Sequence, residues 1–238
     1  MVERWGDSFR EKTLLSGGSA GAVFALGIAL GKSPQYMSDL YRAVSEKCKK
    51  FGTVYKCSVF LEEELRILLN DELAYKNVEG KCGFGTTAFF SKHRWHLSWS
   101  DNEDLLNCIQ ASCHIPLYCR KVDRVYGTEI VDGAYGFSGE NLPHGDETLY
   151  VGIDPHAEIT REFTNVEMVL PSVGDDFDKI VESGYQAFKK WDGRMNQKVG
   201  KRLPNYQALI VLWALKLIEI FIFKILHFVK CLKDFVHV

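Results

Sequence analysis

Short apolar runs and stretches with helical spacing alternate along the chain, which predicts strands interleaved with helices. Residues 12–15 are expected to form a short strand, and the almost wholly apolar residues 20–31 a buried helix. Ser33 and Pro34 then make a typical helix start, because serine caps helix N-termini and proline fits the first helical turn. Residues 61–77 have the spacing of another amphipathic helix.

The second part of the chain continues this alternation. Segments rich in β-branched and aromatic residues predict strands, and one of these strands ends on Asp132. The expected strands cover residues 83–90, 94–100, 124–132 and 147–154, and the expected helices cover residues 101–113 and 174–191. We therefore predict an α/β fold in residues 1–200, a layered sheet flanked by helices.

Residues 207–238 form a separate region with the pattern of one long, very apolar helix. Successive helical residues turn by about 100°, so Lys216, Glu219 and Lys230 fall on one stripe among leucine, isoleucine, phenylalanine and valine. A membrane-spanning helix needs about 20 residues with few charges. We expect residues 201–238 to be an amphipathic helix that lies on a membrane surface with its basic face outward. The alternatives are a helix that packs on the domain or on another copy, and a tilted membrane span.

The charge distribution agrees with a surface tail. Residues 201–238 carry six lysines and arginines against two acidic residues, a net charge of +4, and the other 200 residues carry a net charge of −6. A total of −2 gives no support for a nucleic-acid partner. Lysines near an anionic membrane surface strengthen binding.

The seven cysteines are an odd number and include no CxxC pair, and the N-terminus is polar. Both features favour a reducing, cytoplasmic setting with free thiols. Cys108, Cys113, His114 and Cys119 lie close together in sequence, but their spacing matches no zinc framework. We expect no metal and no cofactor.

The strongest chemical motif is Gly17-Gly18-Ser19-Ala20-Gly21, a G-x-S-x-G sequence between a predicted strand and a predicted helix. In that setting the serine occupies a sharp turn and exposes its hydroxyl. The glycines leave room for the backbone to reverse. The alternative is a glycine-rich turn that only leads into a buried helix.

A nucleophilic serine needs a base, and three residues after it are candidates: Asp132, His144 and His156. The two histidines lie among loop-forming residues. Asp132 ends an apolar strand and is followed by Gly133 and Ala134, so its carboxylate is expected to emerge at the strand end.

Together these motifs resemble the patatin-like phospholipases. Gly17, Ser19 and Gly21 match that family's nucleophile motif, and Asp132, Gly133 and Ala134 match its second motif, D-G-G or D-G-A. The family's turn before the aspartate strand also has a counterpart at residues 111–116, which contain Ala111, Ser112, Ile115 and Pro116. The resemblance covers about residues 13–190. It implies a Ser19–Asp132 dyad that works without histidine.

The resemblance also implies a lipid acyl hydrolase. The expected substrate is a phospholipid or an acylglycerol, and the expected place of action is a membrane or lipid-droplet surface, reached from the cytoplasm by peripheral association. The family has a glycine-rich oxyanion loop upstream of the serine, and the residues before Gly17 do not match it. The alternative function is therefore a non-catalytic protein that keeps the fold and binds lipid surfaces.

Overall fold

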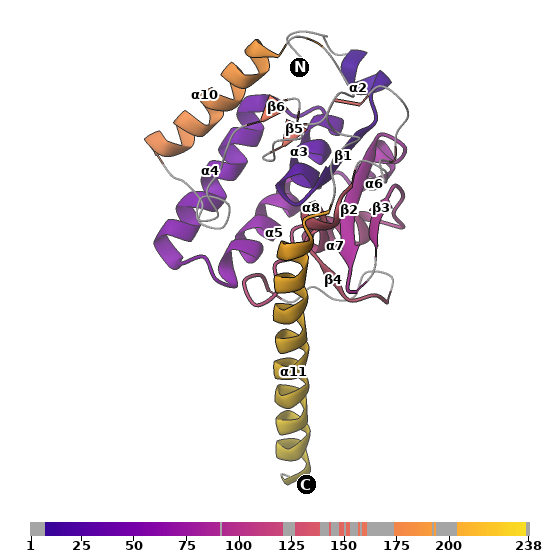
Figure 1. The fold of residues 1–238 in the computed structure, drawn as a ribbon, viewed down its shortest axis with the longest axis vertical. Helices are drawn as coiled ribbons and strands as arrows, with labels where there is room; N and C mark the ends of the chain where they lie inside the picture. Colours follow the sequence, from indigo (N-terminus) through magenta and orange to yellow (C-terminus); the bar gives the residue numbers. More distant parts are fainter. Residues whose placement is uncertain are drawn as a thin grey trace.

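The computed structural model describes residues 8–90, 92–120, 127–138, 143, 148–149, 151–152, 157, 159–160, 174–191, 193 and 204–236. These residues form a mixed α/β fold in which helices surround a small open sheet (Figure 1). The prediction of an α/β class is confirmed at this level.

The sheet is built around strand β2, Cys82–Ala88, in which all seven residues are buried. β1, Leu15–Gly18, pairs with it in parallel, and β3, His93–His96, pairs in antiparallel. β4, Ile130–Val131, pairs antiparallel with the last two residues of β2. Because β3 occupies one edge of β2, β1 and β4 share the opposite edge. A separate parallel pair consists of β5, Val151–Gly152, and β6, Ile159–Thr160.

The first helices begin close to where the sequence places them. α3 covers Ala20–Ala29, and α4 covers Pro34–Phe51. The predicted cap of α4 is confirmed, because the Ser33 hydroxyl accepts a hydrogen bond of 3.1 Å from the Tyr36 amide. β1 extends from Leu15 into the glycines, later than the predicted strand at 12–15, because those residues pair with β2.

The single helix expected at residues 61–77 is wrong. The chain forms α5, Lys56–Leu68, and then α6, Ala74–Val78. Between them the Asp71 carboxylate accepts hydrogen bonds from the Leu73 amide, at 2.9 Å, and from the Asn77 side chain, at 3.0 Å. A side chain that bonds a nearby backbone amide in this way competes with helix continuation.

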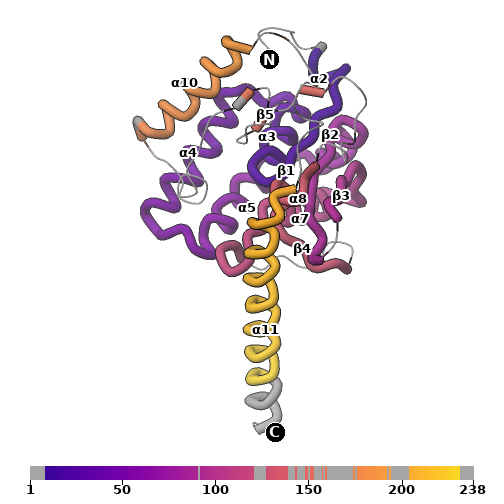
Figure 2. The backbone as a smooth tube through the Cα atoms, viewed as in Figure 1, coloured from indigo at the N-terminus to yellow at the C-terminus, as the bar shows by residue number. Residues whose placement is uncertain are grey.

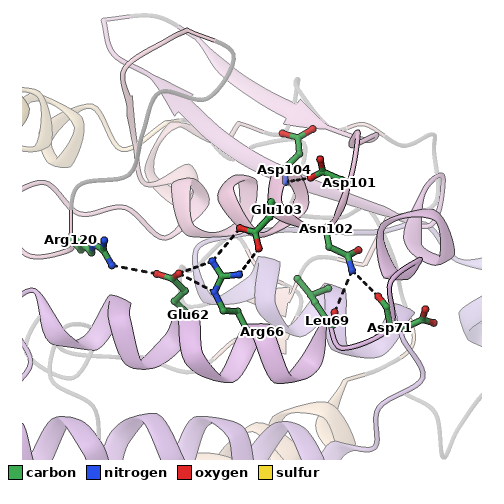
Figure 3. Close-up of polar contacts among 9 residues, drawn as sticks. All are labelled: Glu62, Arg66, Leu69, Asp71, Asp101, Asn102, Glu103, Asp104 and Arg120. Carbon is green, nitrogen blue, oxygen red and sulfur yellow. Dashed lines mark hydrogen bonds and ion pairs between the residues drawn. The ribbon is translucent and has the colours of Figure 1, made fainter.

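A charged contact joins α5 to α7, Asn102–Ser112 (Figure 3). The Arg66 guanidinium binds Glu62 on its own helix at 2.9 Å and also pairs with Glu103 of α7. Arg120 approaches Glu62 from the other side, at 3.9 Å. These groups are partly exposed, so the contact orients α5 relative to α7 more than it stabilises the fold.

Asn102, at the start of α7, connects three elements. Its side-chain amide donates to the backbone carbonyls of Leu69 and Asp71, at 3.3 and 2.7 Å (Figure 3). Its side-chain oxygen accepts from the Tyr75 amide at 2.9 Å. The turn between α5 and α6 is therefore attached to α7, whose other end reaches the candidate site.

Most of the apolar core lies between β2 and helices α3 to α7. α10, Asp175–Lys190, lies beside α4, on the side of the molecule away from the sheet (Figure 1). Arg42 of α4 makes an ion pair of 2.5 Å with Asp178 and stacks over the ring of Phe177. Two further helices are short: α2, Ser8–Lys12, and α8, Gly133–Gly136.

The C-terminal helix α11, Tyr206–Val236, begins against the domain and then extends well beyond it (Figures 1 and 2). Its buried residues are Leu209, Leu212, Lys216 and Glu219, which form one stripe at helical spacing. The expectation that the polar stripe faces outward is wrong for Lys216 and Glu219. They are 1% and 0% exposed, because partners in the domain satisfy their charges. Among the described residues, no helix has the length and apolarity that a membrane crossing requires.

Candidate active site

Ser19 lies on a sharp turn between β1 and α3, as the G-x-S-x-G motif predicts. Its backbone has φ 56° and ψ −133°, a conformation that costs a non-glycine residue free energy. The turn needs Gly17, because a Cβ atom there would lie 2.2 Å from the backbone of Gly21. The chain can therefore reverse only with hydrogen at position 17.

Gly18 and Gly21 have different surroundings. A Cβ atom on Gly18 would lie 2.9 Å from the backbone nitrogen of Ala134, so β1 packs directly on the turn that follows Asp132. A Cβ atom on Gly21 would meet nothing within 4 Å. Position 21 therefore faces open space.

The sheet topology brings Asp132 to Ser19. β1 runs parallel to β2 and ends with Gly18 opposite Gly85. β4 runs antiparallel to β2 on the same edge and ends with Val131 opposite Thr87. The two strands thus run toward each other, and the residue after each lies beside the same point of β2. Two residues that are 113 positions apart in sequence become neighbours.

The Asp132 side chain is buried, with 1% of its surface exposed. One carboxylate oxygen, Oδ1, accepts a hydrogen bond of 2.8 Å from the Ala134 amide, and the backbone carbonyl accepts one of 3.0 Å from the Thr87 hydroxyl. Within the described part of the chain, Oδ2 has no hydrogen-bond partner of standard geometry. A buried, half-satisfied carboxylate is the expected form of a general base awaiting a proton.

Burial raises the pKa of Asp132 to about 6. The Ser19 side chain and the Ala134 amide both act in the opposite direction, since each favours the ionised carboxylate. The Ser19 hydroxyl is therefore close enough to stabilise the carboxylate, although the hydrogen bond between them falls short of standard geometry. A base with a pKa near 6 is ionised at neutral pH and still accepts a proton more readily than an exposed aspartate.

The residue directly after Asp132 must be a glycine. A Cβ atom at this position would lie 1.9 Å from the backbone oxygen of Gly85. A Cβ atom on Gly136 would likewise lie 2.3 Å from the Thr87 hydroxyl oxygen. The turn over residues 133–136 therefore fits closely onto β2, which holds Asp132 at the strand end.

Two contacts at the candidate site were not predicted from the sequence. The hydroxyl of Ser112, at the end of α7, bonds the Ser19 amide at 3.0 Å. Ser112 belongs to the turn at residues 111–116, and that motif was the feature of the sequence that could have indicated this contact. The second contact comes from α11, whose Leu209 and Leu212 pack on Val131, directly before Asp132.

The base of α11 carries a buried charge cluster next to these residues. Lys216 Nζ lies 2.7 Å from Glu219 and 3.1 Å from Glu129. Glu219 also lies 3.4 Å from the His114 ring and accepts a bond of 3.1 Å from the Leu117 amide. Burial favours the neutral form of Glu219, but His114 and Lys216 outweigh it and lower its pKa to about 2. The cluster is therefore held together as ion pairs.

The other sequence candidates divide into two groups. His144 and His156 lie outside the described residues. The Cys119 thiol contacts the Cys113 carbonyl, Cys108 lies beside Trp99, and His114 faces Glu219. Among the residues that the structure describes, no group of three or more His, Cys, Asp or Glu side chains is arranged to hold a metal ion.

Comparison of this chain with models of known families, with curated proteins and with solved structures gave no match in any of the three cases.

Proposed function

We propose that this protein is a serine-dependent lipid acyl hydrolase of the patatin-like type, with Ser19 as nucleophile and Asp132 as base. One observation carries the proposal: a serine on a strained strand–turn–helix elbow lies beside a buried carboxylate whose pKa is about 6. A turn that only connects β1 to α3 has no need of either feature. Strained backbone and raised carboxylate pKa values cluster at functional sites.

In the first half of the reaction, the Ser19 hydroxyl attacks an ester carbonyl while Asp132 takes its proton. The tetrahedral intermediate then collapses. The bond to the alcohol breaks, and the alcohol leaves with the proton from Asp132. The products of this half are the free alcohol and an acyl group on the Ser19 oxygen.

In the second half, Asp132 takes a proton from water as the water oxygen attacks the acyl-enzyme. Collapse releases the fatty acid, and the proton returns to the Ser19 oxygen. No histidine, metal or cofactor is needed for either half. The near-neutral pKa of Asp132 suits both directions of proton transfer.

The negative charge that develops on the carbonyl oxygen needs hydrogen-bond donors. The amides of the first turn of α3 adjoin Ser19, and a helix N-terminus favours an anion. Residues 8–14, the described part of the chain before β1, contain no glycine. The glycine-rich oxyanion loop of the patatin-like family has no counterpart there.

The proposed substrate is a phospholipid or an acylglycerol at a membrane or lipid-droplet surface. The support comes from α11, whose face opposite the buried stripe is apolar and exposed. The exposed apolar residues of this face and its flanks are Tyr206, Ile210, Val211, Leu217, Ile218, Phe221, Ile222, Ile225, Leu226, Phe228 and Val229. A continuous exposed surface made of this many large apolar side chains marks an interaction site.

The position of the charges favours a lipid surface over a second helix. The outward face is wider than the narrow stripe that a coiled coil buries, and Lys224 and Lys230 lie outside its centre. An interfacial helix has this arrangement, with its apolar face among acyl chains and its lysines near the head groups. We infer peripheral association with the cytoplasmic face of a membrane.

A fluorophosphonate probe, which reacts with activated serines, tests the proposal directly. The probe is expected to label the parent chain and to label Ser19→Ala and Asp132→Asn at least about 100-fold more slowly. Ser45→Ala is the control for the serine-to-alanine change, because Ser45 lies in α4, away from the turn at Ser19. Equal labelling of the parent and Ser19→Ala would contradict the assignment.

The second candidate function is a non-catalytic protein that binds lipid surfaces. One observation favours it: the long apolar face of α11. Vesicle binding by a folded chain that the probe does not label would support this function over hydrolysis.

A further inference from the structure

The Ser112 hydroxyl occupies a central position that neither half of the proposed reaction uses. Ser112 is the last residue of α7 and is completely buried. Its hydroxyl donates a hydrogen bond of 2.6 Å to the backbone carbonyl of Gly85 in β2. The same oxygen accepts a bond of 3.0 Å from the backbone amide of Ser19.

Ser112 also lies against the turn that follows the base. A Cβ atom on Gly133 would lie 3.2 Å from the Ser112 hydroxyl oxygen, so the Gly133 backbone packs beside it. One hydroxyl thus contacts the nucleophile residue, the central strand and the residue after Asp132. The first of these residues follows β1, the second lies in β2 and the third begins α8, and all three are distant in sequence.

The bond to Ser19 acts on the strained part of the elbow. Ser19 has a positive φ angle, which a serine adopts only when its surroundings hold it there. The bond holds the peptide nitrogen that defines this φ angle. The hydroxyl is itself fixed, because its own proton is directed to Gly85. The hydrogen bond from the Ser19 amide therefore depends on the Ser112 oxygen as acceptor and also on the hydrogen bond that the Ser112 hydroxyl donates to Gly85.

We propose that Ser112 is a positioning residue for the nucleophile: it holds the Ser19 peptide in the conformation that directs the hydroxyl toward Asp132. Its effect on reaction rate rests on the proposed function, whereas its effect on the elbow does not. The assignment has one further consequence. Because the Ser19 amide is already bonded to Ser112, donors other than that amide must stabilise the oxyanion.

Ser112→Ala removes the hydroxyl with little change in volume, and Ser45→Ala again serves as the matched control. Amide hydrogen exchange of residues 17–24 reports on the elbow whether or not the chain is active. We expect exchange at Ser19 to rise about 10-fold or more in Ser112→Ala and to stay unchanged in Ser45→Ala. Exchange in α10, on the far side of the core, is expected to stay the same in both variants.

Kinetic measurements then test the link to chemistry. With a soluble ester, Ser112→Ala is expected to lower kcat about 10-fold or more with KM unchanged, because Ser112 does not touch the substrate. Fluorophosphonate labelling is expected to slow by a similar factor.

Three results are decisive. Unchanged exchange at residues 17–24 in Ser112→Ala would overturn the proposal. Exchange that rises equally in α10 would also overturn it, because it would indicate a general loss of stability. A local rise in a chain whose parent form is not labelled would support positioning by Ser112 and reject the proposed hydrolase.

Discussion

Lys216 of α11 lies 3.1 Å from Glu129, three residues before the proposed base Asp132. Lys216 is 1% exposed, and its ion pair with Glu129 connects the C-terminal helix to the residue directly before β4. Its second ion pair, with Glu219, lies within α11. The base of α11 is therefore part of the packed domain, while the rest of the helix extends from it (Figure 1).

Lys216→Ala is expected to destabilise the protein by about 3–5 kcal/mol, because it removes the lysine that pairs with the buried Glu219 and the partly buried Glu129. Urea unfolding measures this change. Lys224→Ala is the control, since Lys224 is exposed on the same helix and its replacement is expected to change the free energy of unfolding by less than about 0.5 kcal/mol. Equal effects of the two substitutions would mean that the buried cluster does not hold α11 to the domain.

Gly17→Ala and Gly21→Ala are expected to have opposite effects on stability, although both glycines belong to one motif. A Cβ atom at position 17 would lie 2.2 Å from the Gly21 backbone, so the elbow must distort and the free energy of unfolding should fall by several kcal/mol. At position 21 the Cβ atom meets nothing within 4 Å, and alanine should raise helix stability by up to about 1 kcal/mol. Thermal unfolding of the two variants checks this. A destabilised Gly21→Ala would indicate a packing contact that the structure does not have.

The rate of fluorophosphonate labelling should depend on pH through Asp132. Only the ionised carboxylate accepts the Ser19 proton, so labelling should be slow below pH 5, rise through about pH 6 and level off above pH 7. The pH profile of the labelling rate, measured on folded protein, gives the apparent pKa. A midpoint near pH 4 would contradict a desolvated Asp132.

Asp132→Asn should also change how stability depends on pH. Burial raises the pKa of Asp132 from 3.8 to about 6, so the folded state holds this proton more tightly than the unfolded state. Between about pH 4 and pH 6 the parent therefore loses stability as pH rises, and the asparagine variant does not. Relative to the parent, the variant should gain about 2–3 kcal/mol between pH 4 and pH 7.5. Urea unfolding of both proteins at the two pH values measures the difference, and parallel pH profiles would reject the raised pKa.

The outward face of α11 should bind phospholipid vesicles mainly through apolar contact. Phe221 and Phe228 are 65% and 63% exposed, and replacing both by serine should weaken vesicle flotation strongly while leaving the fold intact. Point variants are preferable to removal of α11, because its base lies in the core. Salt should weaken binding only in part, since Lys216 is buried and Lys224 and Lys230 remain exposed. Undiminished flotation of the double variant would locate the lipid contact elsewhere.

The local features of the site follow from sequence because they depend on neighbouring residues. A G-x-S-x-G segment between an apolar strand and an apolar helix predicts the turn at Ser19, and the structure has it. Likewise, Ser33 and Pro34 predict the start of α4. The break between α5 and α6 depends on hydrogen bonds of Asp71, which hydrophobic spacing does not reveal.

The sequence by itself determined the α/β class, the strained serine turn and the apolar character of the tail, since each depends on the pattern or chemistry of residues within a few positions. Only the tertiary structure decided that Ser19 and Asp132 meet, because β1 and β4 converge on one edge of β2. It also decided which face of α11 is exposed. Helical spacing places Lys216 and Glu219 on one stripe but does not say what covers it, and here buried partners from segments about 90 to 105 residues away in sequence take the place of water.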